Sequence, residues 1–500
     1  MAMIFTDARV FCPDSLKSDR FLSTLVVSGD RVEYVGCEGD EPFRQAQKSG
    51  TTVDLGDRVV LPGFIDGHVH ILNFSLSLQK LDLLLPTHPV PGWIQSVTQG
   101  QALATTLDDL DIRSIYIEAL DLHSTWCNTT ALQELQLESL PEPSGGTIHR
   151  LNGKPSGLLD EAAQFNIWPF LDQVASMEKK LAAIDAAVAA HRCAGYTGLV
   201  DMAMDERNWE ALNLYRSQYG ELRFHMAAHW LIPYSEDHRE ICNHIDRAIE
   251  LHREFIRSTS PDFCINGIKL ICDGTVDGCT AGLHQPYGGF GDVVEPIWPA
   301  MQLASAIRRA TNAGLQCAIH AIGDRTVQQA IDCLSQVPNL RDGRHRIEHL
   351  ELTTPEDAKR LGDLGIVASV QPVHLDPATF GAWPELIGSY RCQRVFAYRE
   401  FADSGAPLVF GTDAPTARHC PLPNLYNATT RHSALGPSLT ETVNPKFAVP
   451  LATAISAATA GLPLPALLTP GLGACDQASK RTLCTNIASA VISHAQPLGL

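Results

Sequence analysis

The chain has 500 residues, of which 45% are hydrophobic and 19% are charged. This composition excludes a mainly disordered chain, because it supplies enough apolar side chains to bury a large core. The formal net charge of −18 at pH 7 argues against a nucleic-acid backbone or an anionic membrane as the main partner. At about 150 residues per domain the length allows about three domains, although barrel folds often exceed that size as one unit.

Cysteine usage and the first residues indicate the compartment. The 14 cysteines are spread along the chain without a Cys-x-x-Cys pair, which argues against a zinc ribbon or a thioredoxin-type redox site. The N-terminus lacks the basic and apolar segments of a signal peptide, and no run of 18 apolar residues predicts a membrane span. We therefore expect reduced thiols and a cytoplasmic protein.

The N-terminal 60 residues are predicted to form a small β domain. Short strand-like segments separated by turn residues are typical of an antiparallel unit. They are Ile4–Val10, Leu22–Val27, Val32–Val35 and Arg58–Leu61. We expect residues 1–60 to form a small β-sandwich, with part of residues 462–500 as the candidate segment to complete it.

After residue 61 the pattern changes to apolar strand-like runs that alternate with helical stretches. The eight runs are Gly63–His70, Tyr196–Met202, Leu222–His229, Asn266–Ile271, Leu315–His320, Arg344–His349, Ile366–Gln371 and Pro407–Thr412. The clearest helical stretches are Met177–Ala194, Trp298–Ala313, Arg325–Gln336 and Thr354–Gly365. Eight strands, most of them followed by a helix, predict an α/β fold, a TIM-like (β/α)8 barrel over residues 61–461.

The connection between the first and second runs is longer than an ordinary βα loop. It spans over 120 residues, includes the strand-like Asp111–Leu120 and contains the Pro- and Gly-rich Pro141–Gly157. A structureless loop of this length is unusual in a compact domain. We therefore predict an inserted subdomain over about residues 82–170, above the mouth of the barrel.

The strongest local signal for chemistry is the pair His68 and His70 at the end of the first run. Residues i and i+2 of a strand point to the same face, so both imidazoles can reach one metal ion. Other polar residues stand in or directly after later runs, and barrel active sites are built at that end of the strands. These residues are Lys269, His320, His349 and Asp413.

The sequence resembles the amidohydrolase superfamily, in particular its amidohydrolase-3, YtcJ-like branch, over about residues 45–460. The resemblance depends on motifs in this order: PGFIDGHVH at 62–70, DLHSTWCNTTAL at 121–132, GGTIHRLNGKPSGLL at 145–159, GIKLICDGTVDG at 267–278, HAIGDRTVQQAI at 320–331, RIEHLE at 346–351, SVQPVHL at 369–375 and GTDAP at 411–415. The tail departs from the family, because no clear strand pair follows residue 476. The β domain is therefore predicted to leave an edge exposed or covered in a homodimer.

The resemblance implies a centre of two divalent metal ions, most simply zinc. His68 and His70 would hold the more buried ion, and His320 and His349 the second. Lys269 would carry a CO2-derived carbamate that bridges the two ions, because a cationic amine cannot ligate a metal; the alternative is an ordinary lysine at a strand edge. Asp413 would ligate the first ion and move protons.

Further residues are candidates for substrate binding or for support of the ligands. The motif at 121–132 suggests a substrate-binding role for His123, Trp126 and Asn128 near the mouth, although Trp126 is equally a candidate for subdomain core. His374 is a candidate to stabilise an oxyanion, with a structural role as the alternative. Asp324 and Glu348 are candidates to orient the ligand imidazoles.

The implied reaction is hydrolysis of a non-peptide C–N bond in an amide, formamide or cyclic amide of a small molecule. A hydroxide that bridges the metals would attack the carbonyl carbon, and Asp413 would pass its proton to the leaving nitrogen. The same metal site could instead serve decarboxylation, deamination or ester hydrolysis, because a fold and its metals do not fix the substrate. A non-catalytic barrel protein is the third alternative.

Overall fold

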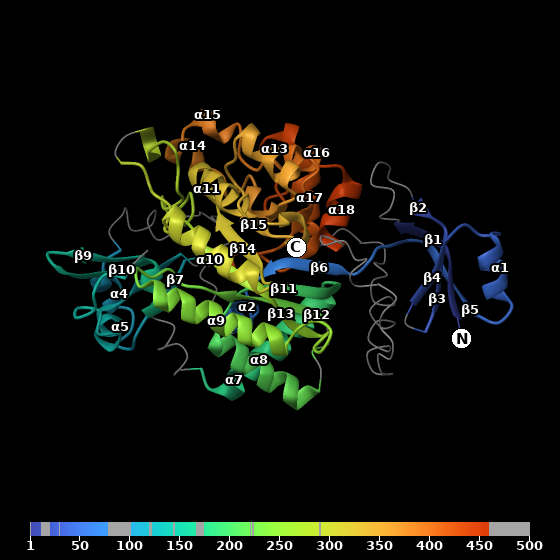
Figure 1. Cartoon of the computed structure of the whole chain (residues 1–500), viewed down its shortest axis with the longest axis horizontal. Coiled ribbons are helices and arrows are strands. Elements are labelled where there is room, and N and C mark those ends of the chain that lie inside the picture. Colours follow the sequence, from blue (N-terminus) through green and yellow to red (C-terminus); the bar gives the residue numbers. More distant parts are fainter. Residues whose placement is uncertain are drawn as a thin grey trace.

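The structure is a computed structural model that describes residues 2–11, 21–29, 31–78, 102–119, 123–143, 146–166, 175–220, 222, 225–289 and 292–459. These residues form a central parallel sheet with helices around it and two smaller sheets on opposite sides of it (Figure 1). The N-terminal sheet lies on one side, and a four-stranded sheet inserted after the first barrel strand lies on the other.

The central sheet confirms the predicted TIM-like barrel. Its eight strands pair in parallel and in chain order, and each of the eight predicted runs overlaps one of them. The strands are β6 (Phe64–Val69), β11 (Tyr196–Met204), β12 (His225–Leu231), β13 (Phe263–Ile271), β14 (Gln316–Ala321), β15 (Arg346–His349), β16 (Val367–Val370) and β17 (Leu408–Phe410). Nearly all residues of β13 to β17 are buried, as expected for a sheet covered on both faces.

Helices pack around the outside of the barrel. They bury one stripe each: in α9, the buried residues Ile241, Ile245, Ala248 and Leu251 recur at helical spacing. The helices of the barrel are α2 (Ile71–Ser77), α7 (Met177–Cys193), α8 (Glu206–Tyr219), α9 (His238–Glu254), α10 (Ala300–Asn312), α11 (Asp324–Leu334), α12 (Leu340–Gly343), α13 (Pro355–Leu364), α14 (Trp383–Leu386), α15 (Ser389–Cys392), α16 (Tyr398–Asp403), α17 (Pro421–Thr430) and α18 (Leu451–Thr459). Among the described residues, no helix has both the length and the apolar character needed to cross a membrane.

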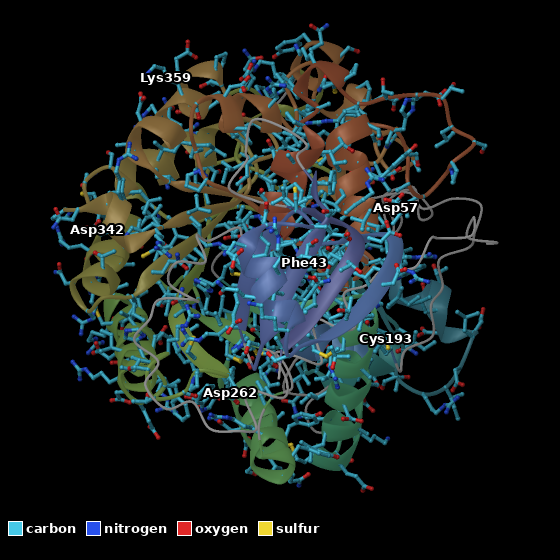
Figure 2. All side chains as sticks on the ribbon, turned by 90° about the vertical axis from the view of Figure 1, so that its right-hand side faces the viewer. Phe43, Asp57, Cys193, Asp262, Asp342 and Lys359 are labelled. Carbon is cyan, nitrogen blue, oxygen red and sulfur yellow. The ribbon has the colours of Figure 1, made fainter. Side chains whose placement is uncertain are left out.

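The N-terminal sheet has five strands and one helix. In Figure 2 it faces the viewer in front of the barrel, with Phe43 of its helix labelled; Phe43 packs against Ile4 and Val26. The elements are β1 (Ala2–Phe11), β2 (Phe21–Leu22), β3 (Thr24–Ser28), β4 (Arg31–Gly36), α1 (Glu41–Gln47) and β5 (Thr51–Val60). The prediction of a purely antiparallel unit is wrong, because β5 runs parallel to β1. The unpredicted helix α1 provides the crossover that a parallel connection needs. Residues 462–500 lie outside the described residues.

The insertion contains a sheet of its own, whereas the sequence predicts only an inserted subdomain here. Its antiparallel strand order is β7-β8-β10-β9, and two small apolar clusters fill it. Its elements are α4 (Ala104–Asp108), β7 (Tyr116–Glu118), β8 (Ser124–Cys127), α5 (Thr129–Glu134), β9 (Gly146–Leu151), β10 (Lys154–Glu161) and the 3-10 helix η1 (Ala162–Asn166). The predicted ends near residues 82 and 170 lie outside the described residues.

The barrel closes where β6 meets the segment after β17. The Asp66 carboxylate accepts hydrogen bonds from the backbone N–H of Thr412 (2.9 Å) and from its hydroxyl (2.5 Å). The Asp413 N–H donates to the His68 carbonyl at 2.7 Å, and the His70 N–H donates to Ala414 at 3.0 Å. These bonds fix the end of the first strand against residues about 345 positions later in the chain.

Gly411 makes this close approach possible. A Cβ atom at this position would lie 2.4 Å from the backbone nitrogen of His68 and 2.5 Å from its Cβ. We expect Gly411→Ala to lower the free energy of unfolding by about 1–3 kcal/mol, measured by urea denaturation. Gly381→Ala is the control, because nothing lies within 4 Å of the added Cβ there. Equal stability of the two variants would contradict this account of the closure.

Candidate metal centre

The polar residues singled out at the strand ends meet at one end of the barrel. His68 belongs to β6, His320 to β14 and His349 ends β15. His70 follows β6 directly, and Asp413 lies three residues after the end of β17. Parallel barrel strands end at a common face, so residues far apart in sequence converge there. The structure therefore brings together all of the candidate ligands from the loops and strand ends.

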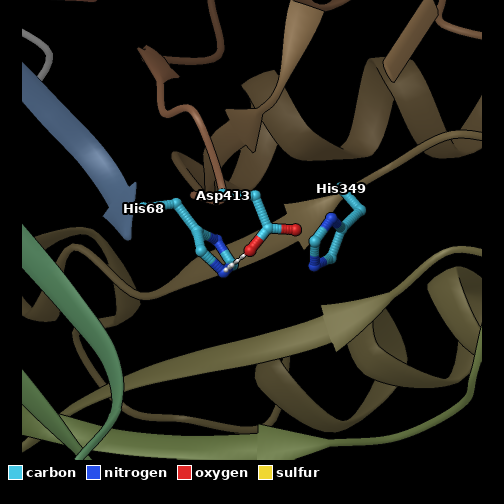
Figure 3. A group of neighbouring side chains, drawn as sticks. All are labelled: His68, His349 and Asp413. Atoms are coloured by element: carbon cyan, nitrogen blue, oxygen red, sulfur yellow. Dashed lines mark ion pairs between the residues drawn. The ribbon is translucent and has the colours of Figure 1, made fainter. Parts of the chain in front are cut away.

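His68 and Asp413 form the buried core of the cluster. The Nδ1 atom of His68 lies 2.7 Å from Glu348 Oε2, and its Nε2 atom lies 3.3 Å from Asp413 Oδ1. His70 Nε2 is 3.1 Å from the same Asp413 oxygen. Figure 3 shows His68 and His349 on either side of the Asp413 carboxylate. Because Glu348 holds Nδ1, Nε2 is the nitrogen of His68 that faces the cluster.

The remaining histidines continue the cluster as a row of rings. The ring centroid of His349 lies 5.0 Å from that of His68 and 4.3 Å from that of His320. His349 adopts a φ of 75° and Asp413 a φ of 58°, values that non-glycine residues rarely adopt. Such backbone strain persists where the surrounding structure enforces it, and it is concentrated at functional sites.

Lys269 lies in β13 beneath these residues and is only 2% exposed. Burial lowers the pKa of its amine, although the charges of Glu348 and Asp413 oppose the shift. Its strand partner is Ala318, two residues before His320. The lysine therefore lies in the dry interior of the barrel, under the histidine row.

The charge states of the cluster suit a cation. Burial lowers the pKa of His68 to about 4, so the ring is neutral at pH 7. Burial would raise the pKa of Asp413, but the imidazoles of His68 and His70 outweigh it and hold the pKa well below its usual range. Likewise the Arg346 guanidinium outweighs burial and keeps the pKa of Glu348 low. Neutral imidazoles beside ionised carboxylates are the donor set of a divalent metal.

Buried polar atoms without hydrogen bonds also support a metal ion as the occupant of the cluster. Within the described chain, three buried atoms of the cluster make no hydrogen bond: His68 Nε2, His349 Nδ1 and Asp413 Oδ1. His68 Nε2 and Asp413 Oδ1 lie 3.3 Å apart as an ion-pair contact without forming a hydrogen bond. Buried polar atoms are nearly always paired, so orphans point to a missing ligand. The ligand atoms of His68, His349 and Asp413 all lie within 4.8 Å of one another. These residues fit a metal ion.

His374, a candidate from the sequence, also reaches the cluster. It lies in the 3-10 helix η3 (Pro372–Leu375), and its Nε2 atom is 3.7 Å from Asp413 Oδ2 and 3.3 Å from Thr416 Oγ1. Its Nδ1 atom is 3.4 Å from the buried Glu351. His349, Glu351 and His374 form a second group with metal-ligand spacing. Glu351 was not singled out from the sequence, although its place two residues after His349 is the signal that could have found it.

The three candidates from the insertion occupy different places. The ring of His123 lies 5.6 Å from that of His320, so this residue borders the cluster. Trp126 is buried among subdomain residues and donates its Nε1–H to the Leu103 carbonyl at 3.1 Å. Asn128 caps helix α5 and bonds the backbone of Ile115 and Arg113. The structure therefore places Trp126 and Asn128 in the framework of the subdomain.

The two carboxylates predicted to orient the ligand imidazoles have different contacts in the structure. Glu348 contacts His68, whereas Asp324 begins helix α11 and accepts a hydrogen bond from the His284 N–H at 3.0 Å. The carboxylate beside His320 is Asp273, whose Oδ1 lies 3.5 Å from Nε2. Asp273 also accepts hydrogen bonds from the backbone of Gly282, Ile322 and Gly323. Its place four residues after Lys269, just beyond β13, could have indicated it.

Comparisons with known proteins agree with this fold. Residues 51–463 match the model of the "Amidohydrolase family". The chain is 27% identical to "Protein LONG AFTER FAR-RED 3" of Arabidopsis thaliana, with 86% of this chain and 78% of that protein covered. It is 26% identical to "Putative amidohydrolase YtcJ" of Bacillus subtilis (84% and 85%) and 22% identical to "N-substituted formamide deformylase" of Arthrobacter pascens (83% and 81%).

A solved structure shares the fold. The crystal structure of an uncharacterized metal-dependent hydrolase from Pyrococcus horikoshii superposes with a TM-score of 0.70 at 20% identity, covering 92% of each chain. The barrel is that of the metal-dependent amidohydrolases, and the buried cluster is its candidate metal site. The chain belongs to the amidohydrolase family, as the sequence motifs indicated.

The contact between Glu348 and His68 gives a prediction about metal affinity. Glu348→Gln keeps the shape but removes the charge that holds His68 Nδ1, so we expect metal binding to weaken about 10–100-fold, measured by competition with a chelator. Glu400→Gln is the control, because Glu400 pairs with Arg394 away from the site. Wild-type affinity in Glu348→Gln would show that the carboxylate does not support the ligand.

Proposed function

We propose that this protein hydrolyses a non-peptide C–N bond of a small molecule, in an amide, a formamide or a cyclic amide. The observation that carries the proposal is the buried cluster of His68, His349 and Asp413, whose donor atoms lie within 4.8 Å of one another at the mouth of the barrel. The likeness to a protein named "N-substituted formamide deformylase" supports the choice of bond.

We assign the metal ligands to residues of the cluster. His68, His70 and Asp413 would hold one divalent ion, and His320 and His349 a second, with Lys269 between them. Imidazole and carboxylate donors suit zinc. Bound there, the ions would acidify a water molecule and polarise the substrate carbonyl.

Lys269 would join the ligands as a carbamate. The reaction with CO2 needs an unprotonated amine, and burial lowers the pKa of this lysine. The product is an anionic group with two oxygens, which replaces a positive charge beside the metals with a negative one. The carbamate therefore supplies the anionic oxygen donors that a protonated lysine lacks.

Asp413 would handle the protons of the reaction. Its carboxylate is ionised at neutral pH, so it can accept a proton from the attacking water and deliver it to the leaving nitrogen. His374, with Nε2 at 3.7 Å from the second Asp413 oxygen, would contact the carbonyl oxygen of the substrate. Glu351 would keep that imidazole in place through its contact with Nδ1.

Substrate profiling tests the proposal directly. Purified protein would be analysed for zinc and then assayed against formamides, N-acyl amines and lactams, with aromatic acids and esters as the competing classes. Hydrolysis restricted to the first three classes, and lost on chelation, is the expected result. Turnover confined to acids or esters would contradict the proposed bond, and full activity without metal would contradict the proposed centre.

Lys269 provides the sharpest test of the carbamate. We expect Lys269→Ala to lose activity and one metal ion, and to recover part of both in acetate or formate, whose carboxylate can enter the space left by the side chain. Metal analysis and kinetics with added carboxylate measure this. Lys180→Ala, which removes a buried lysine of α7, should keep both ions. Wild-type metal content in Lys269→Ala would remove the bridging role.

Asp413 is expected to serve catalysis more than folding. Asp413→Asn keeps the shape and an oxygen donor but cannot take a proton, so kcat should fall about 10²–10⁴-fold with a smaller change in KM. Thermal melting should stay close to wild type. Asp376→Asn is the matched comparison, because Asp376 binds the backbone of Ala434 and should affect stability instead. An Asp413→Asn variant with two metals and normal kcat would assign the proton transfer to another group.

A further inference from the structure

Glu161, the last residue of β10, fixes both the side chain and the backbone of His123. Its Oε2 atom lies 2.7 Å from His123 Nδ1, and its own backbone N–H donates to the His123 carbonyl at 2.8 Å. The carboxylate is 12% exposed, so the pair is largely shielded from water. Two bonds from one residue therefore set where the His123 imidazole points.

The second oxygen of the same carboxylate reaches the barrel. Glu161 Oε1 accepts a hydrogen bond from the Thr280 hydroxyl at 2.7 Å, in the segment that follows β13. At Gly274 a Cβ atom would lie 2.1 Å from Glu161 Oε1 and from Thr280 Oγ1. Glycine at 274 therefore leaves the space that this bridge occupies.

The bridge from Glu161 ends beside the candidate metal ligands. The His123 ring lies 5.6 Å from that of His320, which in turn lies 4.3 Å from that of His349. The Gly274 carbonyl, beside the Glu161 carboxylate, is 3.4 Å from His320 Nε2. Glu161 therefore contacts His123 and lies beside Gly274, the two residues that border His320. It is not itself one of the candidate metal ligands.

The backbone of Glu161 gives an independent indication. Its φ is 52°, a left-handed value that suits glycine and costs energy for a residue with a side chain. An unfavourable conformation at a residue whose two carboxylate oxygens are both bonded suggests that the side chain is kept for its contacts.

We propose that Glu161 is a positioning residue through which the inserted subdomain completes the active site. It holds the His123 imidazole beside His320, where a substrate bound to the metals would meet it, and it ties the subdomain to the segment 274–280. This inference rests on the proposed function and deepens it, since it makes His123 a contact for the substrate and Glu161 the residue that aligns this contact.

The neighbouring residue supplies a matched control. Asp160 also pairs with a histidine, since its Oδ2 atom lies 2.6 Å from His149 Nε2, but that ring is 42% exposed. A general loss of carboxylate–histidine pairing in this sheet would affect both positions. A role at the active site would affect Glu161 alone.

The kinetic test is a double-mutant cycle. We expect E161Q and H123A each to lower kcat/KM about 10–100-fold with two metal ions retained, and the double variant to be no worse than H123A. E161G should lose kcat/KM similarly while it relieves the backbone strain, so its melting temperature should remain near wild type. D160N should keep wild-type kinetics. Independent losses that multiply in the double variant, or wild-type kinetics in E161Q, would overturn the proposal.

A second measurement needs no substrate. Hydrogen–deuterium exchange should rise over residues 274–280 in E161A, because alanine removes the carboxylate oxygen that accepts the Thr280 hydroxyl, and should stay unchanged in D160A. Unchanged exchange in E161A would overturn the tether. If the enzyme proves to act on a bond other than C–N, the proposed function fails, but the same cycle with that substrate still decides the role of Glu161.

Discussion

The buried carboxylate of Asp66 is the interaction on which the candidate site depends. It accepts hydrogen bonds from the backbone and the hydroxyl of Thr412 and from the backbone of His68, and so joins the first barrel strand to the segment after the last. Burial raises the pKa of Asp66 to about 7, while these bonds oppose the rise. In a water-excluded position such bonds are strong and their loss is costly. They hold His68 and Asp413 in contact.

The dry barrel mouth determines the chemistry that the cluster can support. Burial lowers the pKa of His68 and of Lys269, and nearby positive charge keeps Glu348 ionised. An excess of lone pairs and negative charge without solvent favours a bound cation. The insertion adds a separate contribution, since His123 reaches this face from outside the barrel. The framework that closes the barrel and the insertion that borders the cluster are therefore different parts of the chain.

The architecture could be predicted because its signals are local. Apolar runs of strand length alternate with helical stretches, and each of the eight runs falls on a barrel strand. The unusually long first connection likewise indicated an inserted subdomain, although not that it is built on a sheet. The N-terminal unit was predicted less well: helix α1 was missed, and with it the parallel pairing of β5 with β1. A short helix between strands leaves little periodic signal, whereas the direction of the next strand depends entirely on it.

The sequence by itself determined which residues stand at the ends of barrel strands, because strand spacing and the common carboxyl face follow from chain order. Only the tertiary structure decided which side chains meet. Asp273 rather than Asp324 lies beside His320, and Asn128 caps a helix of the insertion instead of facing the cluster. Glu161 reaches Thr280 across 119 residues. Such contacts depend on loop paths and rotamers, which are set by packing between distant segments and leave no periodic trace in the sequence.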